Sequence, residues 1–235
     1  FMSDNRVDTT HVKKVSGSTI GLYLISLVNG ERTFSYWRNN SAATLLGQNI
    51  NDVEHAVKKQ DMIYFSGITL AILDPSSRNN LFSCLKSARR AGKKIAFDPN
   101  LRPKLWSDKK EMCDVIMAGA NLSDIILPSF EDEATWFSDA DPMSTLKRYQ
   151  KVGAEIVVVK NAGEPVSFIS NQGIGTHPVQ SIGTVVDSTA AGDSFNSEIL
   201  VGVLRKIPLS EAISNGANLA KKVIMGHGAL IKSDI

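Results

Sequence analysis

The segment Thr189-Ala190-Ala191-Gly192-Asp193 combines small residues with one carboxylate at the expected start of a helix. Because nothing bulky stands in the way, the backbone N–H groups of Ala191, Gly192 and Asp193 can converge on one anion. A carboxylate repels an anion, so Asp193 is better suited to take a proton from a hydroxyl group that attacks the bound group. Alternatively, Asp193 only complements the helix dipole. A hydroxyl nucleophile beside a bound phosphoryl group would be kinase chemistry.

Two further polar motifs follow short apolar runs. Ser66-Gly67-Ile68 comes directly after Met62-Ile63-Tyr64-Phe65, and Asp98-Pro99-Asn100-Leu101-Arg102 comes directly after Lys94-Ile95-Ala96-Phe97. In open α/β sheets the ligand lies beyond the carboxyl ends of the strands. We therefore expect both motifs to lie near Asp193.

The elements that must position these motifs are short buried strands alternating with helices. The strands are expected at 62–65, 94–97, 125–127 and 156–159, and the helices at 75–91, 107–120, 143–152, 191–206 and 210–225. Strict alternation implies right-handed βαβ crossovers. The sequence therefore predicts an α/β fold, a doubly wound and mostly parallel sheet with helices on both faces.

The first forty residues predict a β-hairpin, with strands Thr19 to Val28 and Glu31 to Arg38 joined by a two-residue Asn29-Gly30 turn. The turn sets the register, in which Val28 lies opposite Glu31 and Tyr23 opposite Tyr36. By the same count Gly21 lies opposite Arg38. One face then carries Tyr23, Phe34, Tyr36 and Arg38, and the other carries Leu22, Leu24, Ser35 and Trp37.

Composition excludes several classes of protein. The chain has 235 residues, 43% hydrophobic and 21% charged, with a net charge of +2, which is typical of an ordinary globular domain and gives no indication of nucleic-acid binding. No apolar run approaches the ~18 to 20 residues that span a bilayer. Cys84 and Cys113 are expected to be free thiols in a reducing compartment, the cytoplasm. The four histidines have no close metal-ligand companion, so no protein-held metal is expected.

Other nucleotide-binding motifs are absent from the sequence. It contains neither a P-loop nor the motifs of a protein kinase. Gly173-Ile174-Gly175 lacks the third glycine of a dinucleotide-binding turn, and we expect it to lie in a polar turn.

The segment around Asp193 resembles the signature of the ribokinase-like carbohydrate kinases, the PfkB family. Within that family, three other stretches resemble 2-keto-3-deoxygluconate kinases, namely 31–43, 65–71 and 97–106. The resemblance covers nearly the whole chain. It implies a ribokinase-like fold and phosphoryl transfer from ATP, with Mg²⁺, to the 6-hydroxyl group of 2-keto-3-deoxy-D-gluconate.

The resemblance also implies a role for particular residues. Asp193 would be the base, and the backbone of Ala190, Ala191, Gly192 and Asp193 would stabilise the phosphoryl charge. The sugar-acid pocket would comprise Tyr23, Tyr36, Arg38, Ile68 and Arg102. Arginine can make a two-pronged contact with a carboxylate. Alternatively, Arg38 ends a solvated hairpin and the two tyrosines are an ordinary cross-strand pair.

On the nucleotide side, the resemblance points to Lys160, Gly163, Gly192, Asn218 and Ser129. Lys160 and Asn218 are equally compatible with solvated positions. Ser129 replaces the asparagine of the family's N-x-x-E element, and its acidic partner is either Asp132 or Glu133. Asp187 either helps to hold a monovalent cation such as K⁺ or only shapes its turn.

We expect one kinase domain over residues 1–235, with 18–39 as part of a β lid. The family begins with strands that this chain lacks, so the domain is expected to be N-terminally incomplete, and Phe1 to Val7 matches the helix that follows them. Ser197-Glu198 replaces the usual Ala-Gly, and Asn161-Ala162-Gly163 replaces K-x-G. The alternatives are a kinase for fructose or ribose and a catalytically silent binding module. The small-molecule partners would be ATP and a sugar acid, and lid hairpins would pair in a homodimer.

Overall fold

The computed structural model describes residues 1–28, 31–180 and 185–231, except for the side chains of 25–28, 31–34 and 36. Its main sheet has the order β3-β4-β5-β6-β7-β8. The first four strands run parallel and the last two are antiparallel to their neighbours. Their bounds are β3 Met62–Ser66, β4 Lys94–Asp98, β5 Ile125–Ile126, β6 Ile156–Val159, β7 Val166–Ser170 and β8 Gly173–His177.

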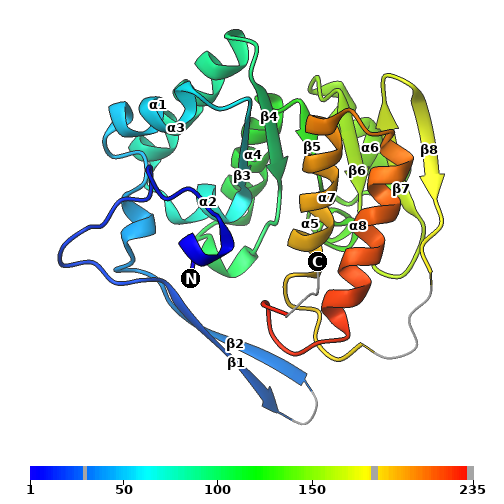
Figure 1. Cartoon of the computed structure of the whole chain (residues 1–235), viewed down its shortest axis with the longest axis horizontal. Helices are drawn as coiled ribbons and strands as arrows, with labels where there is room; N and C mark the ends of the chain where they lie inside the picture. The colour runs from blue at the N-terminus through cyan, green and yellow to red at the C-terminus, as the bar shows by residue number, and fades with distance from the viewer. Residues whose placement is uncertain (29–30, 181–184, 232–235) are drawn as a thin grey trace.

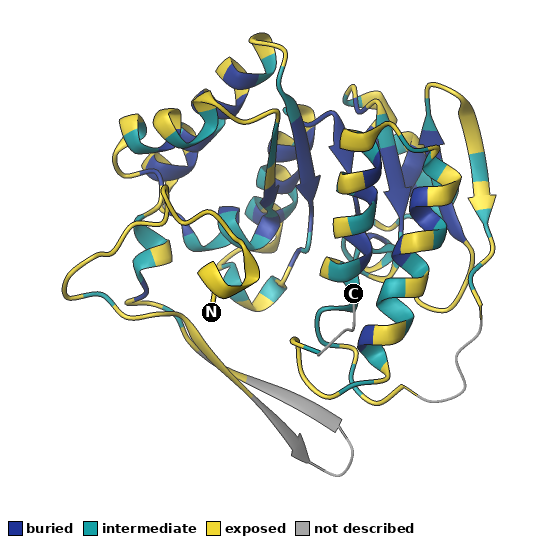
Figure 2. Cartoon of the chain, viewed as in Figure 1, coloured by how far each residue is buried: buried dark blue, intermediate teal, exposed yellow. Residues whose placement is uncertain are grey.

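Helices cover both faces of this sheet (Figure 1). Because side chains alternate along a strand, Ile95 and Phe97 of β4 pack in one core and Ala96 packs in the other. The first core contains residues from α1 (Ile50–Lys58), α2 (Gly67–Ile72), α3 (Pro75–Arg90), α4 (Lys109–Asn121), α5 (Phe130–Phe137) and α6 (Pro142–Lys151). The second contains residues from α7 (Ala191–Arg205) and α8 (Leu209–Ile224). Figure 2 shows the central strands buried between these layers. The predicted α/β fold is confirmed.

The helix boundaries follow from capping chemistry. Asp74 precedes α3, where its carboxylate accepts a hydrogen bond of 2.9 Å from the N–H of Ser77, and Pro75 occupies the first helical position. Asp108 and Asp141 cap α4 and α6 in the same way. The five predicted helices therefore lie within two residues of their expected bounds. In the described ranges no helix is both long and apolar enough to cross a membrane.

The hairpin consists of β1 (Leu22–Val28) and β2 (Glu31–Trp37). Its register pairs Tyr23 with Tyr36 and Val28 with Glu31, as predicted. The Asn29-Gly30 turn lies outside the described residues. In Figure 1 the hairpin extends away from the body of the molecule, beyond the end of the sheet at which β4 finishes.

Two expectations about local structure are wrong. Gly173-Ile174-Gly175 belongs to the edge strand β8 rather than to a turn, and a Cβ on Gly175 would lie 2.7 Å from the Phe168 ring, so glycine lets the two strands pair. Phe1 to Val7 forms only a 3₁₀ turn at Ser3–Asn5, which buries no residue. Without an apolar partner, a stretch this short has no packing to stabilise an α-helix.

Candidate active site

The loops that follow β3 and β4 lie in direct contact. A Cβ on Gly67 would lie 1.7 Å from the carbonyl oxygen of Pro99 and 2.7 Å from Ile116. Only glycine permits this approach of two backbones. Ile68 follows in the first turn of α2, where its N–H donates to the Ser66 hydroxyl at 3.2 Å. The two polar motifs are thus brought together, as expected.

The start of α7 has the backbone shape of an anion-binding nest. Ala190 adopts the left-handed conformation, with φ 64° and ψ 8°, and right-handed helix begins at Ala191. Such a change of hand turns successive N–H groups toward one point. The N–H of Ala191 donates to the Ser188 carbonyl at 3.3 Å. The N–H groups of Gly192 and Asp193 lie in the first turn, where a helix offers them no carbonyl, so they point toward any anion at the nest.

Asp193 is exposed beside this nest. Its carboxylate lies close enough to Tyr64 to raise the pKa of that phenol, after the larger effects of burial and of Asp98. A left-handed, non-glycine residue such as Ala190 costs about 1 to 2 kcal/mol, and strain of this kind is concentrated at functional sites. The geometry suits a base beside a bound anion.

A buried polar network lies behind the nest. The amide nitrogen of Asn196 donates to Asp98 Oδ2 at 2.7 Å and to the Tyr64 hydroxyl at 3.2 Å. The amide oxygen of Asn196 accepts a hydrogen bond of 2.9 Å from Lys160 Nζ. Lys160 also donates to the carbonyl of Leu127 at 2.7 Å. The network therefore joins α7 to the ends of β3, β4 and β6.

The acidic neighbour of Ser129 can now be identified. Glu133 is fully buried, and its carboxylate accepts hydrogen bonds from Arg148 at 2.6 Å and from Tyr149 at 3.0 Å. Glu133 is thus engaged inside the protein. Burial raises the pKa of Asp132, on which the charges of Arg102, Glu131, Asp98 and Lys160 also act. Asp132 is therefore the carboxylate that faces the site.

The residues expected to bind the sugar acid fall into two groups. Arg102 is exposed, adopts φ 46° at the start of a 3₁₀ turn, and lies within electrostatic reach of Asp132. Tyr23 and Arg38 lie together on the hairpin, with the guanidinium 5.6 Å from the ring centroid. Tyr36 is paired with Tyr23 through its backbone, and its side chain lies outside what the structure describes.

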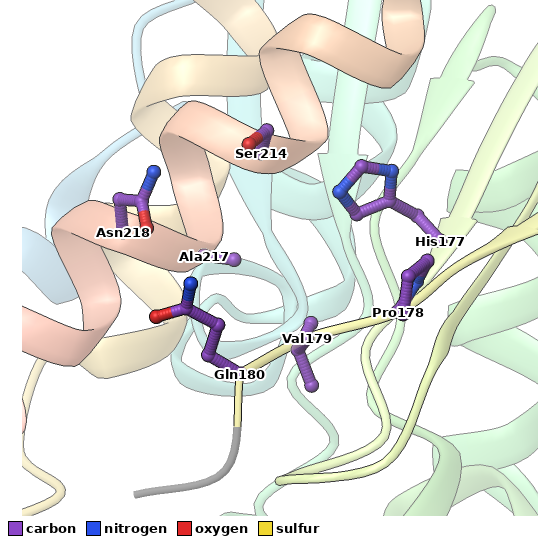
Figure 3. Close-up of a pocket in the computed structure, with 7 residues that line it drawn as sticks. All are labelled: His177, Pro178, Val179, Gln180, Ser214, Ala217 and Asn218. Carbon is purple, nitrogen blue, oxygen red and sulfur yellow. The ribbon is translucent and has the colours of Figure 1, made fainter.

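A pocket of about 310 Å³ lies between α8 and the segment that follows β8. Figure 3 shows Ser214, Ala217 and Asn218 of α8 facing His177, Pro178, Val179 and Gln180 across it. The Lys221 ammonium donates to Gln180 Oε1, on one wall of the pocket, at 3.1 Å. Asn218 therefore lines a cavity.

The other residues expected near the nucleotide are placed as follows. Gly163 lies in the exposed turn between β6 and β7. Ser129 directly precedes α5 without capping it through its side chain, and it is bridged through its backbone to Lys160. Asp187 accepts hydrogen bonds from Thr189 N–H at 2.9 Å and from Gly228 N–H at 3.0 Å, so it shapes the turn before the nest.

Sequence reasoning missed Asn196 and the role of Asp98 as its partner. Asp98 stood inside a motif already singled out, directly after an apolar run. Asn196 gave a weaker signal, because one amide among Phe195, Ile199 and other core positions of a helix does not reveal what it contacts. A polar residue in the apolar stripe of a helix is the feature that indicates such a network.

Comparison with known proteins identifies the family of this chain. Residues 1–235 match the pfkB family carbohydrate kinase. A 2-dehydro-3-deoxygluconokinase of Haemophilus influenzae is 39% identical over 217 residues, 90% of this chain and 69% of that one. One from Escherichia coli is 34% identical over 231 residues, 96% of this chain and 75% of that one. Aminoimidazole riboside kinase from Salmonella enterica, in a crystal structure with aminoimidazole riboside and an ATP analogue, has a TM-score of 0.80 at 24% identity, covering 97% of this chain and 74% of that one. The chain belongs to the PfkB family of carbohydrate kinases.

Proposed function

We propose that this kinase transfers the γ-phosphoryl group of ATP to the 6-hydroxyl group of 2-keto-3-deoxy-D-gluconate. The observation that carries the proposal is the exposed Asp193 beside the left-handed Ala190 at the start of α7. The choice of sugar acid is supported by the names of the two relatives, both 2-dehydro-3-deoxygluconokinases.

In the proposed reaction Asp193 acts as the base. Its carboxylate takes the proton of the sugar hydroxyl as the oxygen attacks the γ-phosphorus. The new oxygen–phosphorus bond forms while the bond from the γ-phosphorus to the β,γ-bridging oxygen breaks, and ADP leaves with that oxygen. In the nest that follows Ala190 and Ala191, the backbone N–H groups of Gly192 and Asp193 stabilise the charge on the transferred group.

The sugar acid would lie between the hairpin and the loops after β3 and β4. Arg38 would bind its carboxylate, supported by Tyr23 and Tyr36, because a guanidinium matches a carboxylate in shape and charge. Ile68 and Arg102 would complete the pocket from the sheet side. A neutral sugar offers Arg38 no charged partner, so fructose and ribose are expected to be poor substrates.

The nucleotide would lie along α8 and the start of α7. The cavity beside Asn218 is large enough for a purine base, and its rim offers amide and imidazole groups. Gly163, Ser129 and Lys160 would lie on the phosphate side with Gly192. Mg²⁺ would neutralise the phosphate charge, and Asp132 suits it as an acceptor for the water molecules that this ion retains. Asp187 would help to hold K⁺ beside the nest.

The outer face of the hairpin suits a second copy of the chain. Leu22 and Trp37 are paired across the strands and each is 56% exposed, and Leu24 lies on the same face with 53% exposed. Apolar side chains gathered on one exposed ribbon are typical of an interface. We therefore propose a homodimer through the lid, which sedimentation of the wild-type chain and of Leu24→Glu would test.

The decisive experiment measures ATP- and Mg²⁺-dependent phosphorylation of 2-keto-3-deoxygluconate, fructose and ribose. Asp193→Asn should lower kcat by about 10²- to 10⁴-fold, the usual contribution of a general base, while ATP still binds. Glu211→Gln is the matched control, because Glu211 is exposed in the first turn of α8 and complements only a helix dipole. Equal kcat values for both variants would overturn Asp193 as base.

The same assay tests Arg38. Arg38→Ala should raise KM for the sugar acid by about 10-fold or more and leave KM for ATP nearly unchanged, because a charge-assisted contact is lost only on the sugar side. An unchanged KM for the sugar acid would remove Arg38 from the pocket. Preference of the wild-type chain for fructose or ribose would favour another sugar kinase, and ATP binding without transfer would favour a silent binding module.

A further inference from the structure

The Lys160 ammonium is held inside the protein by three acceptors. It donates to Leu127 O at 2.7 Å, to Asn196 Oδ1 at 2.9 Å and to Asp98 Oδ2 at 3.5 Å. An ammonium has three N–H groups, so all of them are engaged. The side chain is only 15% exposed. Lys160 is therefore not arranged to reach out and bind a phosphate directly.

The same ammonium lies directly behind the nest. A Cβ built on Gly192 would lie 4.0 Å from Lys160 Nζ. Because Gly192 has no side chain, only its backbone separates the buried charge from an anion held at the N–H groups of the first turn. A cation at this depth acts with little screening by water.

Asn196 determines where that cation lies. Its side chain belongs to a residue that is 1% exposed, one turn after Asp193 on α7. The amide presents an oxygen to the ammonium and its NH₂ group to the Asp98 carboxylate and the Tyr64 oxygen. Leucine has the same size but makes none of these bonds. An amide is thus required to hold a cation and a carboxylate side by side.

We propose that Asn196 is a positioning residue that holds the Lys160 ammonium beneath Gly192, where its charge stabilises the transferring phosphoryl group. Asp98 compensates the buried cation when no nucleotide is present, which allows the ammonium to stay charged. The proposal rests on the proposed kinase function and adds to it a second source of positive charge, behind the backbone N–H groups. It differs from a purely structural role, in which the network only ties α7 to the sheet.

A double-mutant cycle separates the two roles. Asn196→Leu and Lys160→Met should each lower kcat by about 10²- to 10³-fold, the range for loss of one preorganised charge-stabilising group. Because Asn196 acts through Lys160, the double variant should be no slower than Lys160→Met by more than about twofold. Ser197→Ala, at an exposed position on the same helix, is the control and should retain wild-type kcat. Additive losses, or a Lys160→Met variant with wild-type kcat, would overturn the proposal.

A binding measurement without sugar acid keeps the test independent of turnover. The affinity of AMP-PNP relative to ADP reports the contribution of the terminal phosphoryl group, and Lys160→Met should lower this ratio by about 10-fold. An unchanged ratio would overturn the proposal even if Asn196→Leu failed to fold. Absence of phosphorylation by the wild-type chain, with the ratio lowered as expected, would instead contradict the proposed function alone.

Discussion

Two buried networks in this protein each surround one cation, and they differ in what compensates its charge. The first, which we call the helix network, surrounds Arg148 of α6, which donates to Glu133 at 2.6 Å and to Asp139 at 2.6 Å. The second, which we call the site network, is the one behind the nest and surrounds Lys160. The charge of Lys160 is compensated by the single carboxylate of Asp98, and its other acceptors, on Asn196 and Leu127, are neutral. Arg148 thus has two carboxyl groups as partners, and Lys160 has one.

Arg148 and Lys160 also differ in the groups that surround them. The Arg148 guanidinium also lies over the rings of Phe137 and Tyr149, 3.9 Å and 4.4 Å from their centroids, so aromatic rings as well as carboxylates surround it. Lys160 lies behind a helix N-terminus that is open to solvent at Asp193. The helix network therefore stabilises the packing of α5 on α6, and the site network leaves positive charge for a ligand. Burial of a charge alone does not distinguish these roles.

The largest expected effect on folding comes from Glu133. Glu133→Ala should lower the free energy of unfolding by about 2 to 4 kcal/mol, because Arg148 and Tyr149 each lose a buried partner while Asp139 remains. Urea unfolding measures this. Glu131→Ala, at the exposed neighbouring position, should change it by less than about 0.5 kcal/mol. A loss of kcat in Glu133→Ala without any loss of stability would break the division between the networks.

The pH dependence of stability should also trace to Glu133. Burial raises its pKa to about 7, against the opposing charge of Arg148. A carboxyl group with a raised pKa holds its proton in the folded chain, so its contribution is fully present below its ordinary pKa of 4.5 and is lost as the pH rises toward 7. Wild-type stability should therefore fall relative to Glu133→Gln between pH 5 and 8, measured in urea without nucleotide or metal. A constant difference between the two proteins would contradict the raised pKa.

The smallest effect is expected from Thr145, whose buried hydroxyl group donates to Asp139 at 2.7 Å. Thr145→Val keeps the shape and removes one hydrogen bond, which should cost about 1 kcal/mol. Thr135→Val is the control, because its hydroxyl group bonds an exposed helix carbonyl, that of Glu131. Equal losses of stability in both variants would show that a buried hydrogen bond of the helix network contributes no more to stability than an exposed one.

Much of the fold was predictable because local signals agreed with the tertiary structure. Apolar runs such as Ile156–Val159 became buried strands, and caps such as Asp74 fixed where helices begin. The antiparallel edge strand β8 was not predicted, because Gly173 and Gly175 have low β-propensity. Glycine is needed at position 175 because a side chain there would collide with the ring of Phe168 on the paired strand. Pairing at a sheet edge depends on such cross-strand contacts.

The site was predictable only as far as it is local in the sequence. The small residues before Asp193 predicted backbone N–H groups converging on an anion, and Ala190 adopts the left-handed conformation directly before them. The choice between Asp132 and Glu133 required the position of Arg148, and the place of Lys160 required Asn196, which is 36 residues away along the chain. Contacts between residues so far apart along the chain produce no local spacing pattern that could be recognised in the sequence.

The most direct test of the kinase assignment is the site of phosphorylation on the product. The chain is incubated with Mg²⁺, ATP and 2-keto-3-deoxygluconate, and the product is examined by ³¹P NMR with proton coupling. We predict one phosphomonoester coupled to the two protons of carbon 6, formed at similar rates by the wild-type protein and by Glu211→Gln and about 10²- to 10⁴-fold more slowly by Asp193→Asn. A phosphate on another carbon, release of inorganic phosphate alone, or product formation by Asp193→Asn at the wild-type rate would contradict the assignment.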